Sequence, residues 1–390
     1  MGLFSYAQGM ETCEGEKIIK LIKKLIKKIL RPNGTLYSFD FPLNSLSYIN
    51  YKKNFIFNNV MLFGNSRFAV LDHQVFFISN NFDQPKFIEK YLTDEEINEI
   101  IKIKNNTLSL FFSNLHPIEL QGNTISLVHP HSNNFYHFLL EACFDLFEAH
   151  RLNIPFDNLI VDSQLNSKYY SFLKKIIQAF YPGKEINIFK VSKYRYITIR
   201  NFISFPNKNS QVHWLKNQET EPTHYWNKMW LINVQEILSN LYKKPSKRNK
   251  ILFLIRNSTF RNTMNERSVI DFLKRSYIIK TFDPAKESFK SASHSFNSSS
   301  MIVGQSSASL ANILFASQKI TFITWKYNGP EQNKSLMKEL FSILGHNLIE
   351  LDATPLMLQG AGFDWQMYHI TQANLYISPF KVLSAINEKK

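Results

Sequence analysis

Three polar side chains recur every four residues within an apolar segment near the middle of the N-terminal half. His137, Glu141 and Asp145 occupy positions i, i+4 and i+8, and most of their neighbours between 133 and 150 are apolar. On an α-helix this spacing places the three side chains on one face. A carboxylate four residues from a histidine can hold the imidazole and raise its basicity, as a general base requires. The alternative interpretation is an ordinary ion pair on a solvated helix face.

Two further histidines precede this segment. His129 and His131 form with His137 the pattern H-x-H-x5-H, and three histidines can bind zinc. The spacing matches no established metal motif, and no acid or cysteine is expected to complete it, so no metal site is predicted. His131 is instead predicted to contact a sugar hydroxyl or a phosphate, with an ordinary loop histidine as the alternative.

A second set of polar residues follows an apolar run in the C-terminal half. Arg256 comes directly after the run, and Arg261 lies in the turn beyond it. Guanidinium groups at the carboxyl ends of strands are well placed to bind phosphates. Asn265 and Glu266 are predicted to contact the ligand that these arginines bind. The alternative is that Asn265 caps a helix that Glu266 opens.

The segment GQSSASLAN, residues 304–312, joins another apolar run to a helical pattern. Small residues such as Gly304, Ser306 and Ser307 would let backbone amides approach an anion at the start of the helix. A tight turn between a strand and a helix needs small residues for packing alone, which is the alternative. Ser306 is not expected to be a hydrolase nucleophile, because the G-x-S-x-G elbow is not formed.

Alternating strand and helix patterns would position these groups. In the first half, strands are predicted at 124–128, 159–162 and 186–191, and helices at 133–150, 167–180 and 225–242. In the second half, strands are predicted at 251–255, 277–282, 301–304, 320–324 and 348–351, and helices at 266–275, 308–316 and 334–344. Such alternation predicts an α/β fold with mainly parallel sheets. No G-x-G-x-x-G fingerprint for a dinucleotide is present.

The charged segment 243–250, which contains Pro245 and no apolar side chain, is the predicted domain boundary. Before it we expect an N-terminal helix within 1–34 and an α/β domain with a β-rich start at 35–242. After it we expect a Rossmann-like domain at 251–360 and a helical segment at 361–390. The serine-rich stretch 291–300 is predicted to be a loop.

The N-terminal segment 16–32 has a helical period, with isoleucines and leucines on one face and lysines on the other. Such a helix can lie in a membrane interface with its lysines on anionic head groups, or it can pack on its own domain. The net charge of +15 also favours anionic partners. Nucleic-acid binding is not expected, because no aromatic residues alternate with these lysines. No apolar run is long enough to span a bilayer.

The two cysteines, Cys13 and Cys143, are far apart in the sequence and form no metal or redox motif. A reducing cytoplasm is compatible with this usage. Cys143 lies within the apolar segment 133–150 and is predicted to be a buried thiol.

Three segments together resemble glycosyltransferase family 61, which includes bacterial capsule and lipopolysaccharide glycosyltransferases. The first, NFYHFLLE from Asn134 to Glu141, is similar to the family motif N-Y-Y-H-W-L-L-E. The second family motif has an arginine after a strand, then a further arginine, and then Asn-Glu. Arg256, Arg261, Asn265 and Glu266 look like this motif. The third, G-P-H-G-A-G-L-T-N, is matched by residues 304–312, which keep Gly304 and Asn312 but have Ser306, Ser307 and Ser309 in place of the histidine and two glycines.

The resemblance, which covers residues 124–351, implies a GT-B-like architecture of two Rossmann-like domains facing across a cleft. It implies that a nucleotide sugar binds mainly to the second domain and an acceptor mainly to the first, near His131 and Asn134. It further implies inversion at the anomeric carbon, generally without an essential divalent metal or other cofactor.

The resulting hypothesis is an inverting glycosyltransferase that acts on a surface polysaccharide or lipid-linked glycan at the cytoplasmic face of a bacterial membrane. His137 would be the base, and Glu141 would orient it or replace it. Arg256, Arg261 and the amides of Ser306 and Ser307 would stabilise the departing diphosphate. The helix at 16–32 would hold the enzyme at the membrane. A non-catalytic, membrane-attached assembly protein that retains the fold is the alternative.

Overall fold

The computed structural model describes residues 37–42, 46–48, 56–64, 68–71, 74–77, 101–104, 107–112, 117–129, 132–192, 195–205, 226–242, 250–256, 262–326, 336–356 and 374–389. Several predictions made from the sequence lie outside these ranges. They concern the basic helix at 16–32, nearly all of the boundary segment, and the side chains of His131 and Arg261.

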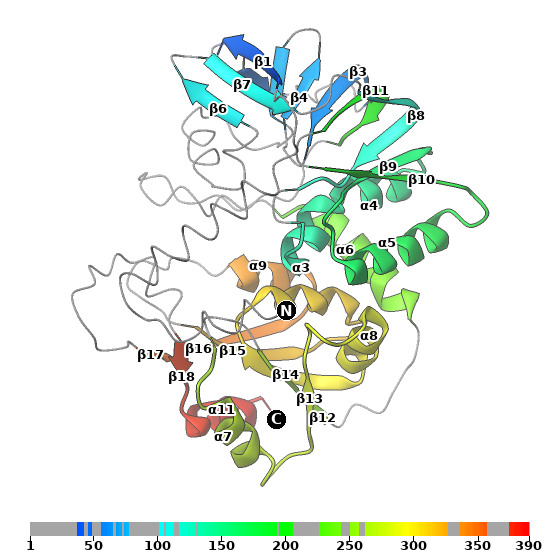
Figure 1. Ribbon diagram of the computed structural model, residues 1–390. Helices are drawn as coiled ribbons and strands as arrows, with labels where there is room; N and C mark the ends of the chain where they lie inside the picture. The colour runs from blue at the N-terminus through cyan, green and yellow to red at the C-terminus, as the bar shows by residue number, and fades with distance from the viewer. Residues whose placement is uncertain are drawn as a thin grey trace, which may run out of the picture.

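The N-terminal half is built on a mixed sheet whose described strands number eight, in the order β10-β9-β8-β11-β3-β4-β5-β2 (Figure 1). Four neighbouring strands of it pair in parallel, namely β8 (Ile118–Ser126), β9 (Asn158–Asp162), β10 (Asn187–Val191) and β11 (Tyr196–Ile203). Its remaining strands are β2 (Leu46–Tyr48), β3 (Ile56–Phe63), β4 (Phe68–Leu71) and β5 (Gln74–Phe77). Beside it, β1 (Tyr37–Pro42), β7 (Thr107–Phe112) and β6 (Ile101–Lys104) form an antiparallel sheet.

The C-terminal half contains a fully parallel sheet whose described strands run in the order β13-β12-β14-β15-β16. These strands are β12 (Lys250–Leu254), β13 (Ile279–Phe282), β14 (Ser299–Gln305), β15 (Thr321–Lys326) and β16 (Asn347–Asp352). Two short antiparallel strands, β17 (Thr354–Leu356) and β18 (Asn374–Tyr376), lie beyond it. The strand order reverses at β12, as it does in doubly wound α/β folds. The predicted α/β class is therefore confirmed.

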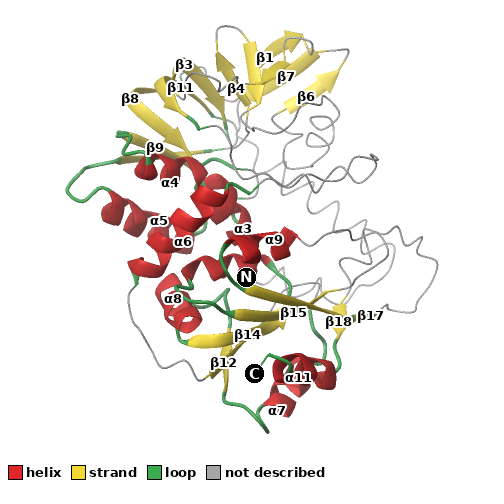
Figure 2. Ribbon diagram, turned by 180° about the vertical axis from the view of Figure 1, so that it is seen from behind, coloured by secondary structure: helices red, strands yellow, loops and turns green. Residues whose placement is uncertain are grey.

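The helices of the first half and part of those of the second half lie between the two large sheets (Figures 1 and 2). Those of the first half are α3 (Phe135–His137), the π-helix η3 (Phe138–Ala142), α4 (Phe144–Arg151), α5 (Ser167–Phe180) and α6 (Lys228–Leu241). Those of the second half are α7 (Glu266–Leu273), α8 (Phe289–Asn297), the 3₁₀-helix η4 (Ala308–Phe315), α9 (Leu336–Ile343) and α11 (Pro379–Asn387). Of these, α7 and α11 pack together on the far side of the C-terminal sheet.

One apolar core spans the contact between the two halves. The ring of Phe289 in α8 lies 5.0 Å from that of Phe135 in α3 and 4.3 Å from that of Phe172 in α5. All three side chains belong to a single buried cluster that draws on both sheets. Across the same contact, Lys168 Nζ donates to the carbonyl oxygen of Pro284 over 2.7 Å. The two halves are therefore packed directly against each other.

The prediction of a loop at 291–300 is wrong. Residues Phe289–Asn297 form α8, and the side chain of Ser288 caps this helix by accepting from Ser291 N. Phe289, Ala292 and Phe296 have helical spacing and bury one face of α8. The serines between them suit a loop by composition, but burial of this apolar face determines the local structure.

The predicted helical segment at 361–390 is shorter than expected within the described residues. α11 covers only Pro379–Asn387, and residues Asn374–Tyr376 form β18, which pairs with β17. No helix in the described ranges is long and apolar enough to cross a membrane.

Gly304 packs directly against the neighbouring strand β12. A Cβ atom at this position would lie 2.8 Å from Leu254 Cβ and 2.9 Å from Leu254 O. The backbone oxygen cannot move without disturbing the sheet. We therefore expect Gly304→Ala to lower the free energy of unfolding by about 1–3 kcal/mol, the usual cost of overpacking a core. Ser300→Ala, at an exposed position of the same strand, is the control in urea unfolding, and equal stability of the two variants would contradict this packing.

Candidate functional site

The carboxylate of Glu141 lies between two imidazoles. Its Oε2 atom is 2.7 Å from His129 Nε2, and its Oε1 atom is 3.1 Å from His137 Nδ1. The two imidazole rings stack with their centroids 5.7 Å apart. The exposed fraction of the side chain is 5% for His129, 11% for Glu141 and 18% for His137. Each carboxylate oxygen therefore faces a different ring in a mostly buried cluster, which is reached by solvent mainly at His137.

Three backbone segments bring these side chains together. His129 follows the carboxyl end of β8, His137 ends α3, and Glu141 lies in η3. Asn134, which was predicted to bind substrate, accepts a hydrogen bond from Tyr136 N over 3.0 Å and so caps α3. The cluster thus sits at the carboxyl end of a parallel strand, where ligands bind in α/β sheets.

The π-helix changes which side chains share a face. Cys143 N donates to Phe138 O, five residues earlier, over 2.9 Å. π-Turns of this kind occur frequently at functional sites. They also shift the helical register, and Asp145 does not join the cluster. Its buried carboxylate accepts from Phe205 N and Ser204 Oγ over 3.2 and 3.3 Å. The prediction of one common polar face is therefore wrong for Asp145.

The electrostatics of the cluster favour a charged carboxylate. Burial alone would raise the pKa of Glu141, but the hydrogen bonds and charges of His129 and His137 outweigh it and hold the pKa well below its ordinary value. An ionised carboxylate can only accept hydrogen bonds, so it can orient an imidazole that directs an N–H toward it. In the His137 tautomer with its proton on Nδ1, Nε2 carries the lone pair that a general base needs.

Arg256, Glu266 and Ser306 form a second cluster in the C-terminal half. Arg256 Nη1 donates to the carbonyl oxygen of Ser306 over 3.1 Å, and Arg256 N donates to Glu266 Oε1 over 3.2 Å. Burial raises the pKa of Glu266; the hydrogen bond from Arg256 opposes this rise, and the charge of Asp283 adds to it. Three residues predicted to bind the donor are therefore brought together at the carboxyl ends of β12 and β14.

Asn265 does not cap α7 with its side chain, so the alternative to ligand contact is wrong for this residue. The helix begins after Asn265, but the amide group instead binds the backbone of Ile377. Asn265 Nδ2 donates to Ile377 O over 2.7 Å, and Ile377 N donates to Asn265 Oδ1 over 3.2 Å. This pairing ties the start of α7 to the segment that precedes α11.

Residues 304–312 build a tight turn rather than an open row of amides. Ser306 N already donates to Trp325 O over 3.1 Å, so the predicted use of this amide for an anion conflicts with the structure. Ser307 Oγ accepts from Ser309 N over 3.3 Å, and buried Asn312 donates through Nδ2 to Ser309 O over 2.8 Å. The helix that follows is a 3₁₀-helix. The small residues of this segment are thus explained largely by the packing of a tight turn, which was the alternative to anion binding.

The helices that follow the two clusters meet in space. α3, which ends at His137, packs against η4, the helix that follows Ser306 and Ser307. Phe135 of α3 and Leu310 of η4 belong to the same buried core. Residues that are far apart in the sequence, and that were predicted to act on one substrate, therefore lie on elements in mutual contact.

His129 is the member of the site that the sequence analysis missed. It was noted only as part of the pattern H-x-H-x5-H, and the expectation that no acid completes this pattern is wrong, because Glu141 contacts both His129 and His137. The available signal was its place shortly after β8, which ends at Ser126.

The predicted burial of Cys143 is confirmed. This burial raises the pKa of the thiol.

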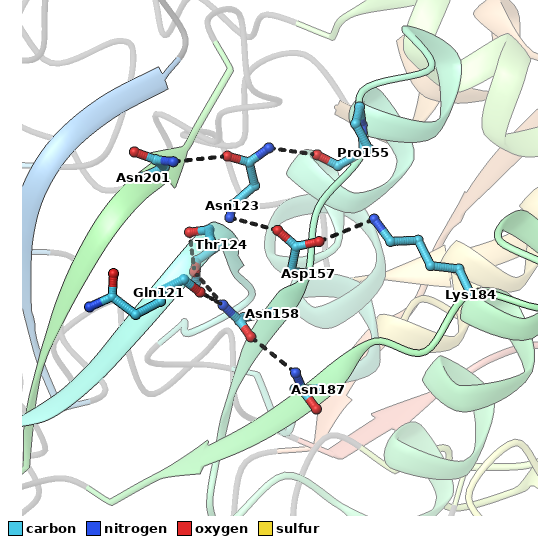
Figure 3. Close-up of polar contacts among 10 residues, drawn as sticks. Gln121, Asn123, Thr124, Pro155, Asp157, Asn158, Lys184, Asn187 and Asn201 are labelled. Atoms are coloured by element: carbon cyan, nitrogen blue, oxygen red, sulfur yellow. Dashed lines mark hydrogen bonds and ion pairs between the residues drawn. The ribbon is translucent and has the colours of Figure 1, made fainter.

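A separate open polar pocket of about 640 Å³ is lined by β3, β8 and β11, which are neighbours in one sheet. It is lined by Asn58, Asn59, Glu119, Leu120, Gln121, Thr198, Arg200 and Asn201. None of these residues was predicted to act in the reaction. Next to it, Asn201 donates to Asn123, whose backbone N–H donates to Asp157, which pairs with Lys184 (Figure 3). This network ties neighbouring strands together.

A comparison with known protein families found a match to the region that contains residues of both clusters. A family model described as Glycosyltransferase 61 matches residues 135–323. The match begins at α3 and ends within β15, so it includes His137, Glu141, Arg256 and Ser306. A search of curated proteins found no match.

The lowered pKa of Glu141 predicts how stability depends on pH. A depressed carboxyl pKa stabilises the fold above the ordinary value of 4.5, and this contribution is lost as pH falls through the folded-state pKa. We expect Glu141→Gln to unfold more easily than the wild type at pH 7, with the difference shrinking below pH 4.5. Urea unfolding over this range measures it, with the exposed Glu119→Gln as control. A difference independent of pH would contradict the charged state assigned here.

Proposed function

We propose that this chain, whose residues 135–323 belong to the glycosyltransferase 61 family, moves a sugar from a nucleotide-sugar donor to a hydroxyl of a bacterial surface polysaccharide or lipid-linked glycan. Membership of the family implies glycosyltransferase activity as such. The observation that carries our assignment of roles is the contact of Glu141 with His137 Nδ1, because it orients an imidazole whose second nitrogen can accept a proton.

In the proposed reaction the acceptor oxygen attacks the anomeric carbon while His137 Nε2 takes the hydroxyl proton. The bond between the anomeric carbon and the donor diphosphate breaks, and the diphosphate leaves with the electron pair. Attack from the face opposite the leaving group inverts the configuration. The imidazolium formed in this step is stabilised by the Glu141 carboxylate 3.1 Å from Nδ1. Glu141 itself is the alternative base.

The leaving diphosphate carries negative charge that the C-terminal half can stabilise. Arg256 supplies a guanidinium, which can donate to several oxygens at once. Its position is fixed by the bonds to Ser306 and Glu266. Arg261, which lies outside the described residues, and the Ser307 hydroxyl are the other proposed donors. We propose that these groups replace the charge of a divalent metal, so that transfer needs none.

The contact between α3 and η4 supports a division of labour in the manner of GT-B enzymes. The acceptor would bind on the side of α3 and the nucleotide sugar on the side of η4. The basic segment 16–32 would hold the enzyme as a peripheral protein on the cytoplasmic face of the membrane, close to a lipid-anchored acceptor. No nucleic-acid partner is proposed.

A second candidate function is a non-catalytic assembly protein that retains the fold. The feature that favours it is the third segment of the family resemblance, where Ser306 stands in place of a histidine and its amide is engaged with Trp325. Release of nucleotide from sugar donors, measured with and without a glycan acceptor, separates the two functions. Donor binding without any release under either condition would favour the assembly role.

Removal of the proposed base should affect turnover far more than donor binding. We expect His137→Ala to lose about 10²–10⁴-fold in kcat, the usual contribution of general base catalysis, with the donor Kd changed little. His294→Gln is the matched control, because its ring contacts only the backbone oxygen of Tyr242 among the hydrogen bonds described for it and a glutamine amide can replace that contact. Full turnover in His137→Ala would exclude the proposed role.

Removal of the Arg256 guanidinium should instead affect mainly the binding of the donor. We expect Arg256→Gln to weaken binding of a nucleoside diphosphate by about 10- to 100-fold, since a hydrogen bond to a charged group contributes about 1.5–3 kcal/mol. Calorimetric titration measures this affinity, and circular dichroism checks that the variant is folded. Arg267→Gln, at a highly exposed arginine, is the control. Unchanged affinity in Arg256→Gln would place the diphosphate elsewhere.

A further inference from the structure

We propose that His129, His137 and Glu141 bind one divalent transition-metal cation of the zinc type, and that this cation inhibits sugar transfer. One ligand atom from each residue lies within 4.8 Å of the other two. The inference goes beyond the proposed function, which requires no metal. Only its inhibitory part rests on that function, because metal binding can be measured without any reaction.

The geometry of the cluster is close to that of a metal site. Two histidines and one glutamate are a known ligand set for zinc. With bonds of about 2.0–2.2 Å in a tetrahedron, two ligand atoms of one zinc lie about 3.3 Å apart. His129 Nε2 lies 2.7 Å from Glu141 Oε2 and His137 Nδ1 lies 3.1 Å from Glu141 Oε1, and one ligand atom from each residue lies within 4.8 Å of the other two. Side-chain adjustment alone is needed to bring one nitrogen of each ring and one carboxylate oxygen to this spacing.

The surroundings of the cluster favour a cation. Its acidic member, Glu141, is 11% exposed, and a buried carboxylate is stabilised by a positive charge close to it. The three ligands come from the end of β8, the end of α3 and the turn η3, so they are positioned by separate packed elements. His137 is the most exposed of the three at 18%. A cation can enter there, and its fourth coordination position can take water or an acceptor oxygen.

Metal binding and general base catalysis exclude each other at His137. A cation on Nδ1 needs the lone pair of that nitrogen, so the ring proton moves to Nε2. Nε2 then has no lone pair to accept a proton from the acceptor hydroxyl. Binding of the cation therefore converts a base into a metal ligand, and removal of the cation restores the base. This predicts inhibition that a chelator reverses.

The test uses the full chain, purified without a polyhistidine tag and freed of metal with a chelator. Titration with ZnCl₂ should give one tight equivalent by calorimetry, and Co²⁺ should give the visible absorption of a four-coordinate site. His129→Ala and Glu141→Gln should each weaken zinc binding more than tenfold, whereas His294→Gln should not. X-ray absorption of the zinc-loaded wild type should identify two imidazoles and oxygen in the coordination shell, a result that requires no variant to fold.

Binding of equal affinity in Glu141→Gln, or an absorption spectrum without two imidazoles, would overturn the metal site. In the transfer assay, one equivalent of zinc should abolish turnover and a chelator should restore it. Undiminished turnover of the zinc-loaded enzyme would overturn the inhibitory role alone. Absence of turnover in the metal-free wild type would instead contradict the proposed function, and it would leave the binding result intact.

Discussion

A negative carboxylate held between two imidazoles, with little water around it, is the interaction that organises this part of the molecule. Glu141 keeps its charge despite burial because His129 and His137 each contact one of its oxygens. The local backbone is arranged to make these contacts. His129 follows the end of β8, a capped helix start presents His137, and the π-helix η3 carries Glu141. The same arrangement places Nδ1 of His137 3.1 Å from the carboxylate, and the proposed chemistry depends on this contact.

The second constraint is the apolar core that joins the two halves. Helices from both sheets contribute to one buried cluster, and contacts such as Phe135 with Phe289 set how α3 lies against η4. The position of the imidazole cluster relative to Arg256 and Ser306 is thus determined by packing rather than by direct bonds between the two sets. Polar groups with a chemical role can then remain available for substrates, while burial of large aromatic side chains, about 1.5–3 kcal/mol each, supplies the stability.

Capping residues and the spacing of apolar residues predicted the helices well where this local pattern agrees with the packing. The prediction of a helix at 167–180 is confirmed to the residue, because Asn166 caps it and its apolar side chains share one face. Residues 289–297 were missed because serines surround the three apolar residues that define the buried face. Asp145 and Asn265 were assigned by spacing and by residue type, but their partners, Phe205 and Ile377, are distant in the sequence. A single sequence does not indicate such contacts. The pairing of His129 with Glu141 was missed for a different reason, because Glu141 was assigned only to His137.

The core shared by the two halves has a consequence for motion. Rotation of one sheet away from the other would expose Phe135, Phe172 and Phe289 to water and would break the bond from Lys168 to the Pro284 carbonyl. Each exposed ring would cost free energy of about the amount that its burial contributes. Hinge opening between the two sheets is therefore disfavoured, and the helices that carry His137 and follow Ser306 keep their relative positions.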